Sequence, residues 1–173
     1  MTQILHVTDG IYAGGADAVE AVEFLRGRCI KHVLKLYISV DIGDAGPGML
    51  PLMSPFSPPH KVTWPGDFRV YDNAVGEILT AELLRNGVTY LRDQVAMGNH
   101  VLIAASADWT GRCAVFAAGY AIERGADLRE FFCRRLKKFI FVSFVRQHWE
   151  TLLSAYNTPY TWEDVVSWTR LDD

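Results

Sequence analysis

The chain has 173 residues, 50% of them hydrophobic and 21% charged, and it carries a formal net charge of −3 at pH 7. Its length suits one domain that buries about two-thirds of its unfolded surface. The slight negative charge argues against nucleic acid or an anionic membrane as a partner, and the absence of an apolar run of about 20 residues argues against a membrane span. Three cysteines without metal-ligand spacing favour a reduced, cytoplasmic protein with no metal and no cofactor.

The first part of the chain predicts a β-α-β unit. Strands are expected over 4–7 and 10–15, and the second strand closes in a glycine turn. Asp17 can cap the helix that follows, and Gly27 ends it. A buried strand over 30–37 comes next, which completes the unit.

A long proline-rich loop follows at 44–61. It contains five prolines and little regular pattern. Its large apolar side chains are Met49, Leu50, Leu52, Met53 and Phe56. Structureless loops of this length inside a compact domain are usually functional or disordered. Two interpretations stay open: the loop packs over a neighbouring helix, or it binds a partner or covers the site.

The middle of the chain predicts two short strands, a long helix and a buried strand. The short strands are expected over 62–64 and 68–71. Apolar residues then keep a helical period over 74–97, where Gly87 is expected to weaken or break the helix. The buried strand is expected over 101–104.

The remainder of the chain is predicted to be helical. An apolar helix is expected from about Arg112 to Gly125, and amphipathic helices are expected from Asp127 and over 144–156. A terminal helix at about 161–170 begins with capping-box spacing. No linker or internal repeat interrupts this order, so the pattern predicts one α/β domain.

The loop between the strand at 101–104 and the next helix has the features of an anion site. Ser106 lies among small and polar residues, and Arg112 follows six positions later. Unpaired amides and the helix dipole converge where a strand passes into a helix, and both attract anions.

Two stretches in the first half have distinctive sequences: Ile-Tyr-Ala-Gly-Gly-Ala-Asp-Ala at 11–18 and Cys-Ile-Lys-His-Val-Leu-Lys-Leu at 29–36. They resemble the Leu-Tyr-Leu-Gly-x-x-x-Ala and Gly-Ile-Thr-His-Val-Leu-Asn-Leu motifs of the dual-specificity branch of the protein tyrosine phosphatase superfamily. Asp72 falls where that family carries its general acid, and 147–156 is similar to its closing helix. The resemblance covers about 4–156. It implies a central, mostly parallel sheet flanked by helices, with the phosphate loop at a strand-to-helix turn.

The resemblance assigns the phosphate loop to eight positions. They are Ala105, Ser106, Ala107, Asp108, Trp109, Thr110, Gly111 and Arg112. With Arg112 as the phosphate-binding Arg, Ser106 stands at the nucleophilic Cys, Ala105 at the preceding His and Trp109 at the loop Gly. A rival alignment puts Ala105 at the Cys and Gly111 at the Arg. We prefer the first, because Gly111 and Arg112 match the Gly-Arg end of many such loops, and neither alignment provides a cysteine nucleophile.

The residues of this loop argue against turnover. A helix N-terminus lowers the pKa of a cysteine enough to give a thiolate at neutral pH, whereas a serine hydroxyl stays protonated unless a base lies beside it. Ser106 could still hydrogen-bond an oxyanion that Arg112 grips in a bidentate fork. Asp108 repels an anion unless it pairs with Arg112, and Trp109 is large where close backbone approach needs glycine. We therefore expect the loop to bind phosphate poorly.

Asp72 and Cys113 each keep two interpretations. Asp72 is either a surviving general acid or a plain turn residue. Cys113 is either a reactive thiol at a helix N-terminus or a small core residue.

The leading hypothesis is a pseudophosphatase, a catalytically inactive phosphatase-like module that binds a phosphoprotein or an unphosphorylated protein partner. A second hypothesis is a phosphate-recognition module that uses Arg112. The third is a tyrosine, serine or threonine phosphatase whose nucleophile position is Ser106, as a natural variant or a Cys-to-Ser form.

Overall fold

The computed structural model describes residues 3–38, 64–106, 109–137 and 145–170. A five-stranded sheet in the order β1-β2-β5-β3-β4 forms its centre. The strands are β1 (Ile4–Thr8), β2 (Ile11–Gly15), β3 (Ile30–Lys35), β4 (Arg69–Asp72) and β5 (His100–Ala105). Only β1 and β2 pair antiparallel among these strands, so the predicted mostly parallel sheet is confirmed. The proline-rich loop predicted at 44–61 lies outside the described residues.

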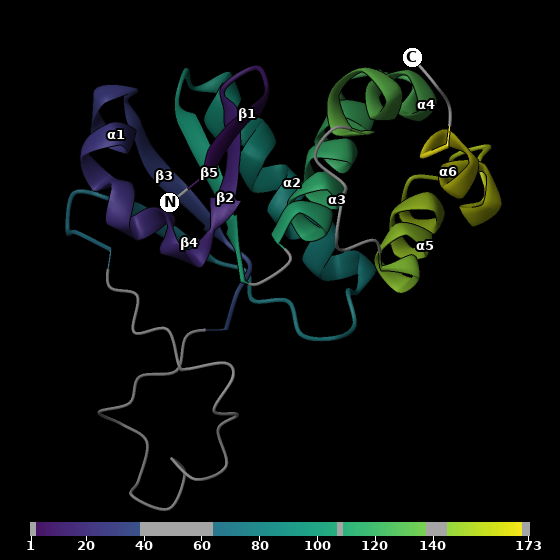
Figure 1. Ribbon diagram of the computed structural model, residues 1–173, viewed down its shortest axis with the longest axis horizontal. Helices are drawn as coiled ribbons and strands as arrows, with labels where there is room; N and C mark the ends of the chain where they lie inside the picture. The colour runs from purple at the N-terminus through teal and green to yellow at the C-terminus, as the bar shows by residue number, and fades with distance from the viewer. Residues whose placement is uncertain (1–2, 39–63, 107–108, 138–144, 171–173) are drawn as a thin grey trace, which may run out of the picture.

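Helices cover both faces of the sheet (Figure 1). One face carries α1 (Val22–Gly27), which follows a short 3-10 helix over Ala16–Ala21. The other face carries α2 (Ala81–Ala96) and α3 (Trp109–Glu123). The remaining helices are α4 (Leu128–Phe131), a π-helical turn over Phe132–Leu136, α5 (Arg146–Ala155) and α6 (Trp162–Trp168). None of the described helices has the length and hydrophobicity needed to cross a membrane.

Alternation along the strands divides the core between the two faces. Val33 of β3 packs with Leu25 of α1, whereas Leu34 belongs to the larger cluster with Leu84 of α2 and Phe116 of α3. Both strand residues are fully buried, as expected for a parallel sheet covered on both sides. The near-continuous apolar strands of the sequence are explained by this double burial.

The long helix begins later than the sequence predicts. The helical period predicts a start at about position 74, but α2 starts at Ala81, and the side chain of Thr80 before it accepts a hydrogen bond from the Leu83 amide at 3.1 Å. The preceding segment is irregular because side chains of α5 bind its backbone, as described below. Gly87 does not break α2 either. A Cβ atom there would lie 2.4 Å from Cε1 of Phe116, so the missing side chain lets α2 approach α3.

Two other helix starts were also predicted wrongly. Asp17 does not cap a helix: Gly15 is the N-cap of the 3-10 helix, with no side-chain hydrogen bond at that cap. The helix after β5 begins at Trp109, three residues before Arg112. By contrast, the capping box predicted for the terminal helix is present at the start of α6.

Candidate functional site

The candidate site lies at the edge of the sheet where the parallel strands end. Across this edge, Gly14 of β2 pairs with Ala104 of β5, Ala104 with Lys35 of β3, and Lys35 with Asp72 of β4. Ligand sites in open α/β sheets lie outside the carboxyl ends of the strands. The predicted loop and the predicted acid position therefore share one edge.

The turn between β5 and α3 carries most of the predicted site. Ala105 is the buried last residue of β5, and Ser106 follows it half-buried. Residues 107–108 lie outside the described residues, so the suggested pairing of Asp108 with Arg112 does too. Trp109 opens α3, and Thr110 and Gly111 lie in its first turn.

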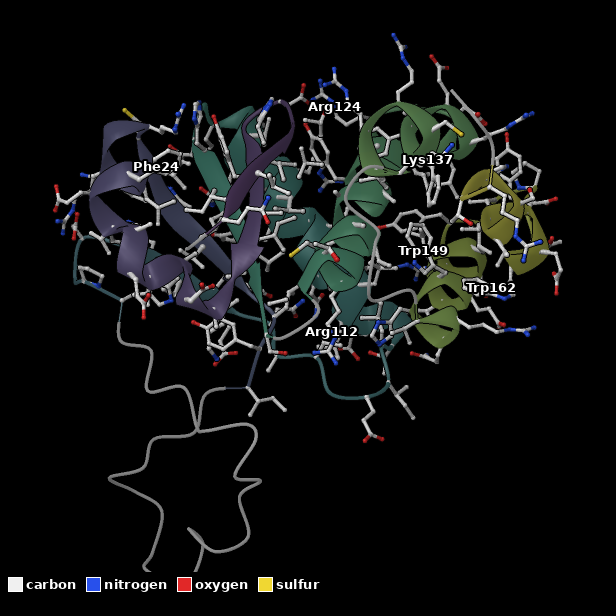
Figure 2. The ribbon with its side chains drawn as sticks, viewed as in Figure 1. Phe24, Arg112, Arg124, Lys137, Trp149 and Trp162 are labelled. Atoms are coloured by element: carbon white, nitrogen blue, oxygen red, sulfur yellow. The ribbon has the colours of Figure 1, made fainter. Side chains whose placement is uncertain are left out.

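Arg112 lies in the first turn of α3 and reaches the segment that follows β4. Its Nη1 donates to the Val75 carbonyl and its Nη2 to the Gly76 carbonyl, each at 3.4 Å. Figure 2 shows Arg112 at the margin of the molecule near the end of β5. A guanidinium has five N–H donors. Arg112 therefore holds a neighbouring backbone segment and still has donors to offer.

Side chains from α5 bind the same segment further along. Gln147 accepts from the Leu79 amide at 2.8 Å and donates to the Leu79 carbonyl at 2.9 Å, and Thr151 donates to that carbonyl at 2.9 Å. His148 Nε2 donates to the Glu77 carbonyl at 3.2 Å. Burial lowers the pKa of His148, and the charge of Arg112 lowers it further against the opposing effect of the Glu77 bond. The segment from Val75 to Leu79 is thus held by α3 and α5 together.

Asp72 is the last residue of β4, and its carboxylate is paired. Lys35 Nζ lies 3.3 Å from Asp72 Oδ1. The side chain of Lys35 is 9% exposed and that of Asp72 is 68% exposed. At the position predicted for a general acid, the carboxylate therefore faces a buried cation.

Cys113 points into the core. Its Sγ lies 3.4 Å from the Ile103 carbonyl, and the residue is 2% exposed. Burial raises the pKa of its thiol well above the ordinary value, against the smaller effects of the Gly14 carbonyl contact and Arg112. A buried thiol with a raised pKa is a poor nucleophile. Of the two interpretations of Cys113, the structure supports the small core residue.

Several solved structures share this architecture. Human DUSP28 matches with a TM-score of 0.65 at 16% identity, over 89% of this chain and 93% of that chain. A mouse putative dual specificity phosphatase matches with a TM-score of 0.65 at 14% identity, over 89% of this chain and 86% of that chain. The human tyrosine phosphatase-like serine/threonine/tyrosine-interacting protein matches with a TM-score of 0.58 at 15% identity, over 87% of this chain and 93% of that chain. The chain has the dual-specificity phosphatase fold.

Sequence comparison adds nothing to this likeness. No protein-family model matches the chain, and no curated protein matches it in sequence. Identities of 14–16% to the three structures establish the fold alone. The predicted fold class is therefore confirmed, while the roles of Ser106, Asp72 and Arg112 remain predictions.

Four residues that shape this site were not predicted from the sequence. They are Lys35, Gln147, His148 and Thr151. Lys35 left a detectable signal, because a lysine inside the apolar strand over 30–37 needs a partner if its face is buried. The three residues of α5 gave no signal in the sequence, because their partners are backbone groups of a distant segment.

Among the described residues, no cluster of three or more His, Cys, Asp or Glu could hold a metal ion.

Proposed function

We propose that this protein is a pseudophosphatase, a protein-binding module with the phosphatase fold and without turnover. The observation that carries the proposal is the β5-to-α3 turn, which has no cysteine from Ala105 to Arg112. The adjoining thiol of Cys113 is buried and cannot take the place of the nucleophile. Ser106 lacks a histidine nearby in sequence that could act as its base.

The contacts of the two retained residues support the proposal. Arg112 donates to the carbonyls of Val75 and Gly76, and Asp72 pairs with Lys35. In a working site, the arginine would bind the phosphate and the acid would protonate the leaving group. Here both side chains support neighbouring parts of the fold.

The partner class follows from the fold and the charge. A fold retained without turnover suits binding, and a formal net charge of −3 gives no reason to expect nucleic acid. We therefore infer a protein partner, phosphorylated or not, and a cytoplasmic setting in which the three cysteines stay reduced.

Hydrolysis of p-nitrophenyl phosphate and 3-O-methylfluorescein phosphate tests the absence of turnover. The purified chain and its Arg112→Ala variant are expected to give the same rate, equal to that of buffer. Arg112→Lys is the matched control, because it keeps the charge and loses the fork. A rate above buffer that Arg112→Ala removes would show a working phosphatase and overturn the proposal.

Phosphate recognition is the second candidate, and the position of Arg112 favours it. The side chain is half-buried in the first turn of α3, beside the half-buried Ser106. A structural relative from mouse is complexed with zinc tungstate, whose anion resembles phosphate in shape. Calorimetry with a phosphotyrosine peptide and with sodium tungstate tests this function. Binding that Arg112→Ala abolishes would establish recognition, whereas no heat, or heat unchanged in the variant, would exclude it.

A further inference from the structure

The ammonium of Lys35 lies inside the protein. Lys35 stands on β3 between Val33 and Tyr37, which belong to the core cluster on the α1 face, and its side chain is 9% exposed. Its Nζ lies 4.9 Å from the centroid of the Tyr37 ring, a cation-π contact. Removing an ammonium from water is strongly unfavourable without a counter-charge. This lysine therefore needs an anion close by.

The register of the sheet supplies that anion. Lys35 and Asp72 are Cα partners in the parallel β3–β4 pair, so their side chains point to the same face. Lys35 Nζ and Asp72 Oδ1 are 3.3 Å apart. The Asp72 side chain is 68% exposed, so its carboxylate reaches the ammonium while keeping much of its hydration. The unfavourable free energy of burying a charge belongs mainly to the Lys35 ammonium, and the Asp72 carboxylate offsets it.

We propose that Asp72 is the structural counter-ion of Lys35 and that the pair fastens the edge strand β4 to β3. A counter-ion must keep its negative charge, whereas a general acid must give up a proton. As a counter-ion, Asp72 has a role that conflicts with proton donation, whether or not the chain binds phosphate.

Asp72 stands directly before the segment that Arg112 holds, and the backbone of β3 continues to bind that segment. Beyond the strands, the Asn73 amide donates to the Lys35 carbonyl at 2.8 Å, and the Val75 amide to the Leu36 carbonyl at 2.9 Å. Arg112 binds the carbonyls of Val75 and Gly76 immediately afterwards. The ion pair therefore fastens β4 at the point where the chain enters the segment that Arg112 binds.

A double-mutant cycle on stability tests the proposal. The four proteins are the wild type, Asp72→Asn, Lys35→Met and the double variant, each unfolded in urea. Asp72→Asn is expected to raise the unfolding equilibrium constant at least about tenfold, because it leaves a buried cation uncompensated. In the Lys35→Met background the same change is expected to alter that constant less than about threefold, because no cation remains.

Two controls separate charge from shape. Asp72→Glu keeps the carboxylate and is expected to stay within about threefold of the wild type. Glu77→Gln removes an exposed carboxylate nearby and is expected to have no effect. Equal effects of Asp72→Asn in both Lys35 backgrounds, or no effect in either, would overturn the counter-ion role. No phosphate compound is used in these measurements. The counter-ion role can therefore be overturned while the absence of turnover is upheld, and the absence of turnover can be overturned while the counter-ion role is upheld.

Discussion

At the scale of single residues, the three cysteines differ in how far they reach solvent. Cys29 is exposed, Cys133 half-buried and Cys113 buried with a raised pKa. We expect iodoacetamide at pH 8 to label Cys29 first and Cys113 only when urea unfolds the chain, because the reactive species is an accessible thiolate. Mass spectrometry of timed digests measures this order, with Cys29→Ser as the control. Labelling of native Cys113 as fast as Cys29 would mean that the thiol is available for chemistry.

His148 gives the protein a dependence on pH. Burial lowers its pKa below the ordinary 6.5, so the unfolded chain binds a proton more readily than the folded one. The contribution of neutral His148 to the free energy of unfolding is therefore fully present above about pH 6.5. It is lost as the pH drops towards the folded-state pKa, by at most about 1.4 kcal/mol per pH unit for one proton.

Urea unfolding at pH 5 to 8 measures this dependence. His148→Gln should flatten the decline at acid pH. It should not abolish it, because burial and the charge of Arg69 also lower the pKa of His32. An unchanged slope in His148→Gln would show that another group controls the acid limb.

At the scale of secondary-structure elements, α2 and α3 approach each other at Gly87, a position of α2 that carries no side chain. Gly87→Ala should destabilise the protein by about 1–3 kcal/mol, although alanine favours a helix by about 1 kcal/mol, because its Cβ would lie 2.4 Å from Phe116. Gly27→Ala in α1 is the matched control, since a Cβ there would meet nothing within 4 Å. Thermal or urea unfolding compares the two variants. A neutral Gly87→Ala would mean that Phe116 moves aside at no cost.

The elements also show which local signals the sequence could and could not provide. The buried strand over 30–37 was predictable because an apolar run can be recognised without knowledge of a distant partner. The capping box of α6 was predictable because its residues lie within four neighbouring positions. The start of α2 was not predictable. Leu79 continues the helical period, but its backbone is bound by Gln147, 68 positions away. Likewise, the sequence around Gly87 does not show that Phe116, 29 positions away on α3, occupies the space that a Cβ would need.

At the scale of the whole molecule, the topology brings the predicted site residues to one sheet edge. Asp72 ends β4 and Ala105 ends β5, with β3 between these two strands. Ser106 and Arg112 follow Ala105 in the turn and at the start of α3. The sequence could predict these site positions through the resemblance of its motifs to the dual-specificity phosphatases. It could not predict the partners of Asp72 and Arg112, which come from β3 and from the segment after β4.

Those partners explain why a single substitution should not restore a phosphatase. A cysteine at position 106 would regain a thiol near a helix N-terminus. It would still lack the histidine before it, since Ala105 stands there, and the sequence of the loop would still contain Asp108 and Trp109. Asp72 and Arg112 would also keep their contacts with Lys35 and Val75.

The most direct measurement is therefore hydrolysis of 3-O-methylfluorescein phosphate by Ser106→Cys, with Ser106→Cys/Arg112→Ala as the matched control. We expect both proteins to hydrolyse the substrate no faster than the wild type, because several parts of the catalytic set are replaced. A rate in Ser106→Cys that rises above the wild type, and that Arg112→Ala removes, would contradict this. It would mean that the site is competent and lacks only its nucleophile.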